Sequence, residues 1–135
     1  MALLLDEDYE ELRDAGIVID EDATTRLLVF KNFPLPNGMY TVPHADILVV
    51  IPANYNQGGN DMFWTFPRLV KRDSQGIINT NNSGDSDNRT YQGREFCRWS
   101  RHWFDNSPSR WRPGRDNAMS IYRRVDDALK NPHRQ

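Results

Sequence analysis

A series of apolar segments separated by turn-forming residues constrains the fold of this chain more than any other feature. Residues 26–33 are rich in Leu, Val and Phe, and residues 46–51 are apolar enough for a strand buried on both faces. Between them, residues 34–38 (Pro-Leu-Pro-Asn-Gly) favour a tight hairpin, which makes residues 39–42 the returning strand. After a Gly- and Asn-rich loop, residues 62–70 predict a fourth strand. These segments predict a four-stranded antiparallel meander.

Helical patterns flank the predicted strands at both ends of the chain. Residues 6–14 predict a short acidic helix that ends before Gly16. Asp116 is a candidate N-cap for a final helix that ends before Pro132. The apolar residues of that helix recur at i, i+3, i+4 and i+7 spacing: Ala118, Ile121, Tyr122, Val125, Ala128 and Leu129. The expected fold class is therefore α+β, with the C-terminal helix packed on the sheet.

The 135 residues fit a single domain, 1–135, with a polar loop at about 71–91 that is either disordered or functional and a tail at 131–135. One cysteine and three widely separated histidines predict no disulfide, no metal site and no cofactor. The apolar residues after Met1 end at Asp6, which is too early for a signal peptide or membrane anchor. We therefore expect a cytoplasmic protein with no membrane partner.

Charge is distributed unevenly although the net charge is only −2. Nine of the nineteen acidic residues lie in the first twenty-two positions, whereas residues 94–115 contain six arginines. This polarity favours a protein partner or a charged docking face. A nucleic-acid-binding domain that uses the Arg- and Trp-rich stretch is the least favoured interpretation, because the chain as a whole is mildly acidic.

Residues 93–114 concentrate the reactive side chains of the chain. Cys97, Ser100 and His102 lie within six residues, which is the grouping that nucleophilic catalysis needs. A thiolate at Cys97 would be favoured by neighbouring arginines, and His102 could act as the base for Ser100, with Asp105 orienting it. The alternatives are structural: a lone cysteine is often a small buried hydrophobe, and interleaved Arg and Trp can simply pack together.

The order of these elements resembles the ubiquitin-conjugating (UBC) fold. Four segments resemble, more closely, the prokaryotic family E of ubiquitin-conjugating-enzyme-like proteins: residues 46–52 (DILVVIP), 61–64 (DMFW), 98–103 (RWSRHW) and 111–114 (WRPG). The resemblance covers nearly all of residues 26–130, and RWSRHW is its most specific part. Family members occur in bacterial phage-defence operons beside a ubiquitin-like protein, an adenylating activating enzyme and a peptidase.

The resemblance implies acyl transfer. The C-terminus of a ubiquitin-like protein is received from the activating enzyme on a side-chain nucleophile, as an ester or a thioester, and passed to an amine of a target protein. Eukaryotic relatives use a cysteine shortly before Trp-x-Pro, preceded by His-Pro-Asn, which this chain lacks. Ser100 fits that spacing to Trp111 better than Cys97, so Ser100 is the preferred nucleophile, with His102 as base or orienter and Cys97 as the alternative. Asn88 is the preferred oxyanion donor among the loop asparagines.

The residues around the nucleophile have two possible roles. Arg98, Arg101, Trp103 and Trp64 are candidates for binding the partner protein, and the alternative is that they pack for structure. For the whole chain, the alternative to a conjugating enzyme is a catalytically inactive UBC variant that binds a ubiquitin-like protein without a covalent bond.

Overall fold

A computed structural model describes residues 2–103 and 110–134. In chain order, the elements are α1 (Asp6–Asp14), β1 (Ile19–Asp22), β2 (Leu27–Pro34), β3 (His44–Val50), β4 (Phe63–Phe66), β5 (Arg89–Tyr91), β6 (Arg94–Trp99) and α2 (Ala118–Lys130). The strands form one antiparallel sheet in the order β1-β2-β3-β4-β6-β5. The α+β class is confirmed, as are both helices.

The prediction of a four-stranded sheet is wrong, because the sheet has six strands. Residues 39–42 do not form the returning strand: only Tyr40 pairs there, in an isolated bridge with Lys71, and β3 begins at His44. Three short strands were not predicted, because one is polar and the other two lie in segments that were interpreted as a loop and as a reactive stretch. β1 reads Ile-Asp-Glu-Asp, β5 lies inside the polar loop 71–91, and β6 lies inside the reactive stretch.

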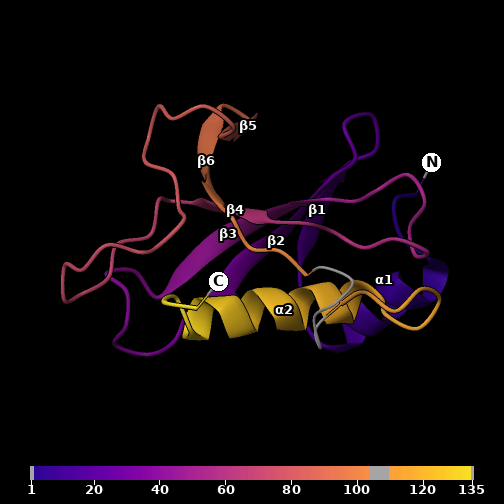
Figure 1. Cartoon of the computed structure of the whole chain (residues 1–135). Helices are drawn as coiled ribbons and strands as arrows, with labels where there is room; N and C mark the ends of the chain where they lie inside the picture. The colour runs from indigo at the N-terminus through magenta and orange to yellow at the C-terminus, as the bar shows by residue number, and fades with distance from the viewer. Residues whose placement is uncertain (1, 104–109, 135) are drawn as a thin grey trace.

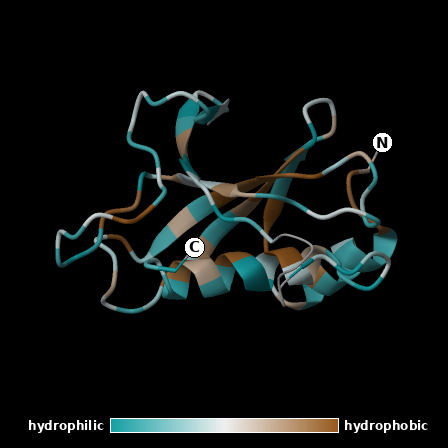
Figure 2. Cartoon of the chain, viewed as in Figure 1, coloured by the Kyte–Doolittle hydropathy of each residue, from teal (hydrophilic) through white to brown (hydrophobic). Residues whose placement is uncertain are grey.

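The sheet curls, and α2 runs beneath it (Figure 1). Alternate residues of β2 point to opposite faces, so Leu28 and Phe30 join the core against α2 while Leu27 and Val29 join a second apolar cluster on the other face. Both sets are buried, which explains why β2 and β3 are apolar at successive positions. Figure 2 shows hydrophobic colour along the strands that cross α2 and hydrophilic colour on α1.

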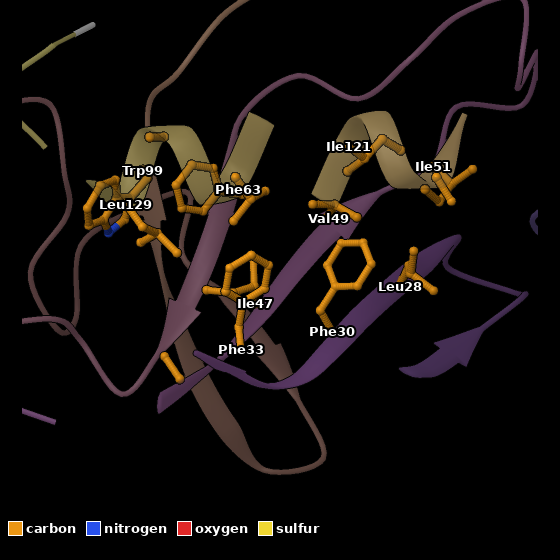
Figure 3. Packing of buried hydrophobic residues seen from close by; sticks show 14 of the residues in the cluster. Leu28, Phe30, Phe33, Ile47, Val49, Ile51, Phe63, Trp99, Ile121 and Leu129 are labelled. Atoms are coloured by element: carbon orange, nitrogen blue, oxygen red, sulfur yellow. The ribbon is translucent and has the colours of Figure 1, made fainter. Parts of the chain in front are cut away.

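The core on the α2 face is built from large aliphatic and aromatic side chains. Phe30, Val49 and Ile51 lie close to Ile121 of the helix, and Phe63 stacks on Trp99 at a centroid distance of 5.2 Å (Figure 3). Trp99 is the last residue of β6 and is only 2% exposed. Its burial fixes the position at which the chain leaves the sheet toward Ser100.

The first turn of α2 is held by Asn117, one residue later than the predicted cap. The Asn117 side chain accepts a hydrogen bond from the Ser120 N–H, and the Asn117 N–H donates to the Ser120 hydroxyl. Asp116 is instead buried and accepts hydrogen bonds from Arg112 and Ser120. In the described part of the chain, no helix has the length and hydropathy needed to cross a membrane.

Asp46 joins three strands, which leads to a stability prediction. Its carboxylate accepts hydrogen bonds from the Asn32 N–H and from Arg94, and it pairs with Lys31 at 3.2 Å. Burial alone would raise the pKa of Asp46, but these three donors outweigh burial and lower it. The charged carboxylate therefore stabilises the fold above the unfolded-state pKa, and this contribution is lost as pH falls through the folded-state pKa.

We expect Asp46→Asn to lower the free energy of unfolding by about 1–3 kcal/mol at neutral pH. The deficit should begin to shrink as pH falls below about 4, the unfolded-state pKa, and should disappear only when the folded carboxylate, whose pKa is lower, takes up its proton. Urea titrations of both proteins from pH 7 down to about pH 2 measure the deficit. A deficit that stays constant over this range would show that the charge of Asp46 does not stabilise the fold.

Candidate active site

The pairing of β4 with β6 brings two distant segments together. Phe63 lies opposite Trp99 in the antiparallel register. The pairing continues past the named strands, because the Met62 N–H donates to the Arg101 carbonyl at 2.8 Å. Asp61 is thereby placed beside the segment that carries Ser100 and His102, although 41 residues separate it from His102.

Ser100, His102 and Asp61 form a continuous chain of side-chain contacts. The Ser100 Oγ lies 3.0 Å from Nε2 of His102, and Nδ1 of His102 lies 2.8 Å from Oδ1 of Asp61. A carboxylate can only accept, so the Nδ1–H donates to Asp61 and Nε2 is left to accept the Ser100 hydroxyl proton. One tautomer of His102 satisfies both contacts. This is the arrangement of nucleophile, base and orienting carboxylate that activates a serine.

The three side chains differ in exposure. The His102 side chain is 34% exposed and that of Asp61 is 51% exposed, while Ser100 is partly buried. The proposed orienting residue Asp105 lies outside the described residues. In the sequence, Asp61 has no predicted role beyond its place in the DMFW segment. Its role at the site depends on the pairing of β4 with β6, which the sequence did not predict.

The backbone of Ser100 is fixed from both sides. Its N–H donates to the Asn79 carbonyl at 2.8 Å, and its carbonyl accepts from the buried Arg101 guanidinium at 3.0 Å. Arg101 also donates to the carbonyls of Ile78 and Pro132. The hydroxyl is therefore presented by a segment with little freedom to move, which favours a preorganised site.

Cys97 lies in a different environment from Ser100. It is 2% exposed within β6, where it pairs with Thr65 of β4. Burial raises the pKa of the Cys97 thiol, and the nearby Glu95 carboxylate raises it further. A thiol that is buried and held protonated is a poor nucleophile. These properties match the structural interpretation of the cysteine.

Asn88 lies beside Cys97. Its side-chain N–H₂ donates to the Glu95 carboxylate, to the Asn82 carbonyl and, at 3.8 Å, to the Cys97 sulfur. Its side-chain oxygen accepts from the Arg98 N–H. These contacts fasten the loop to β6, and they give Asn88 a structural role.

The four candidate partner-binding residues differ in exposure. Trp64 is 3% exposed and Arg101 is 2% exposed, with the Arg101 guanidinium over the ring of Trp99. Arg98 is partly exposed and pairs with Asp87. Trp103 is also partly exposed and lines a cavity of about 410 Å³ beside α2. Only Arg98 and Trp103 have surface that a partner protein could contact.

Trp111 holds the loop that carries Asp61. Its indole N–H donates to the Asn56 carbonyl at 2.8 Å, and its ring lies against Gly59, where a Cβ atom would come within 2.1 Å of the ring. Gly59 is therefore required by this close approach. Through these contacts Trp111 reaches the segment just before Asp61.

Among the residues that the structure describes, no three His, Cys, Asp or Glu side chains converge in a way that could hold a metal ion. The model of one protein family, described as prokaryotic E2 family E, matches residues 4–132. Searches of curated proteins and of solved structures found no match. The family match confirms the resemblance seen in the sequence.

Proposed function

The chain belongs to prokaryotic E2 family E, and on that premise we propose that it carries the C-terminus of a ubiquitin-like protein as an oxyester on Ser100. The carrier would receive this acyl group from an adenylating activating enzyme and transfer it to an amine of a target protein. The observation that supports Ser100 is its contact with His102, which in turn contacts Asp61. The carrier, the ubiquitin-like protein, the activating enzyme and the target would meet in the cytoplasm.

In the loading step, the Ser100 oxygen attacks the carbonyl carbon of the activating enzyme's thioester. His102 Nε2 takes the hydroxyl proton as the new C–O bond forms, and the C–S bond breaks. The proton then passes from His102 to the departing sulfur or to solvent. Asp61 keeps His102 in the required tautomer and stabilises the imidazolium that forms in between.

In the transfer step, the amine of the target attacks the ester carbon. An alkoxide is a worse leaving group than a thiolate, so the departing Ser100 oxygen needs a proton. His102 can take a proton from the attacking amine and pass it to the Ser100 oxygen as the bond from carbon to that oxygen breaks, because its Nε2 lies 3.0 Å from that oxygen. The same imidazole thus acts as base in loading and as acid in transfer, and this double role compensates for the lower reactivity of an ester.

Trp103 and Arg98 are the proposed contacts for the partner proteins. Trp103 follows His102 directly, and the charged residues that line its cavity are four arginines and two aspartates: Arg110, Arg112, Arg123, Arg124, Asp116 and Asp127. Asp116 pairs with Arg112 and Arg124, and the excess of arginine leaves a surface complementary to acidic side chains. Trp64 and Arg101 are better explained by packing, because both are buried.

The chemical nature of the adduct tests the proposal. We expect a covalent adduct when the chain is mixed with the ubiquitin-like protein, its activating enzyme and ATP. An oxyester should survive thiol reductant and be cleaved by mild alkali, and intact-mass spectrometry follows both treatments. Cleavage by the reductant would instead assign the acyl group to Cys97. Failure to form an adduct would favour a UBC variant that binds without covalent bonds.

A further inference from the structure

The contacts of Ser100 are those of a complete hydrolytic triad. His102 Nε2 lies 3.0 Å from the Ser100 Oγ, and Nδ1 lies 2.8 Å from Asp61. Hydrolases need no other side chains to generate an attacking serine and to activate water afterwards. In such a reaction the acyl group passes first to the serine and then to water. The water must reach the acyl group from the side of the base.

Water has that access here. The side chains of His102 and Asp61 are 34% and 51% exposed, so the base and its orienting carboxylate face solvent. We infer that the chain is also a hydrolase of activated acyl esters, with Ser100 and His102 as catalytic residues and Asp61 as a positioning residue. This activity needs neither an activating enzyme nor a ubiquitin-like protein, and it does not depend on the proposed conjugation.

The reaction proceeds in two balanced steps. In the first, the Ser100 oxygen bonds to the ester carbonyl carbon, its proton moves to His102 Nε2, and the bond from carbon to the alcohol oxygen breaks as that oxygen takes up a proton. In the second, His102 takes a proton from water, and the resulting oxygen attacks the acyl carbon. The bond from carbon to Ser100 then breaks, and His102 returns a proton to Ser100. The products are a carboxylic acid and an alcohol.

The substrates are selected by reactivity more than by shape, because the base is exposed. Esters with good leaving groups, such as aryl esters, should react, whereas amides should not, because their leaving groups require more assistance. The same chemistry would discharge any acyl group already on Ser100, so water competes with the target amine whenever the amine is scarce.

p-Nitrophenyl acetate measures the activity in the intact chain. We expect the wild-type chain to release p-nitrophenolate, and Ser100→Ala to lower the catalysed rate by roughly 10²-fold or more. Cys97→Ala should retain the wild-type rate. Equal rates for the wild type and Ser100→Ala would overturn the inference, as would a loss of rate confined to Cys97→Ala. Circular dichroism verifies that each variant is folded.

A second measurement needs no variant. A fluorophosphonate reacts with an activated serine, so that an O–P bond forms and fluoride and a proton leave. Peptide mapping should locate the label on Ser100, and labelling of other serines alone would contradict the inference. Adduct formation with a ubiquitin-like protein but no ester hydrolysis would reject only the hydrolase. Ester hydrolysis without such an adduct would reject only the conjugation.

Discussion

Ser100→Ala should abolish the covalent adduct with the ubiquitin-like protein, whereas Cys97→Ala should leave it intact. The alanine removes the oxygen that lies 3.0 Å from His102 and that would carry the acyl group. The Cys97 thiol is buried and its pKa is raised, so its removal takes no thiolate from the site. Intact-mass spectrometry after incubation with the activating enzyme, the ubiquitin-like protein and ATP measures both variants.

Ser100→Cys provides a matched positive control for this result. It replaces the oxygen by sulfur at the same position, so any adduct should become sensitive to thiol reductant while that of Cys97→Ala stays resistant. Such a switch would place the acyl group at position 100. An adduct that persists in Ser100→Ala and disappears in Cys97→Ala would contradict the proposal and assign the role to the buried thiol.

His102→Ala should slow adduct formation by about 10²- to 10⁴-fold, because it removes the base next to the Ser100 hydroxyl. Asp61→Asn should slow it less, by about tenfold or more. The amide can no longer hold His102 in one tautomer or stabilise the imidazolium, but solvent partly replaces the half-exposed carboxylate. Single-turnover rates of adduct formation, measured with saturating activating enzyme, give both effects.

Asp73→Asn is the matched control for Asp61→Asn. It makes the same change of charge, and the Asp73 side chain is 52% exposed, almost the same as that of Asp61, but it pairs with Lys71 and not with His102. Its rate should equal that of the wild type. Equal slowing by both substitutions would show that net charge affects the rate and that Asp61 does not orient the base.

Local patterns in the sequence predicted the parts of the fold that depend on neighbouring residues. α1 and α2 follow from helical periodicity, and β2 and β3 follow from apolar runs that are buried on both faces. The strands β1, β5 and β6 carry too many polar residues for such patterns to identify. They are held in the sheet by hydrogen bonds to their neighbours, and no single-sequence pattern records those bonds.

The candidate site shows the same division. Ser100 and His102 are two residues apart, so an extended chain places both on one side, and their pairing could be predicted from spacing. The sequence leaves Cys97 open between a buried hydrophobe and a nucleophile. Its place within β6, paired with Thr65, buries it. Only its residue type suggests Asn88 as an oxyanion donor, whereas its contacts with Glu95 and Cys97 depend on how the loop folds back.

By itself, the sequence determined the α+β class, the family and the serine–histidine pair, because each of these is encoded in residues close together along the chain. Only the tertiary structure decided the third member of the site and the burial of the cysteine. Asp61 reaches His102 across 41 residues through the pairing of β4 with β6. That pairing depends on burying Phe63 and Trp99 together against α2, which is a property of the whole core.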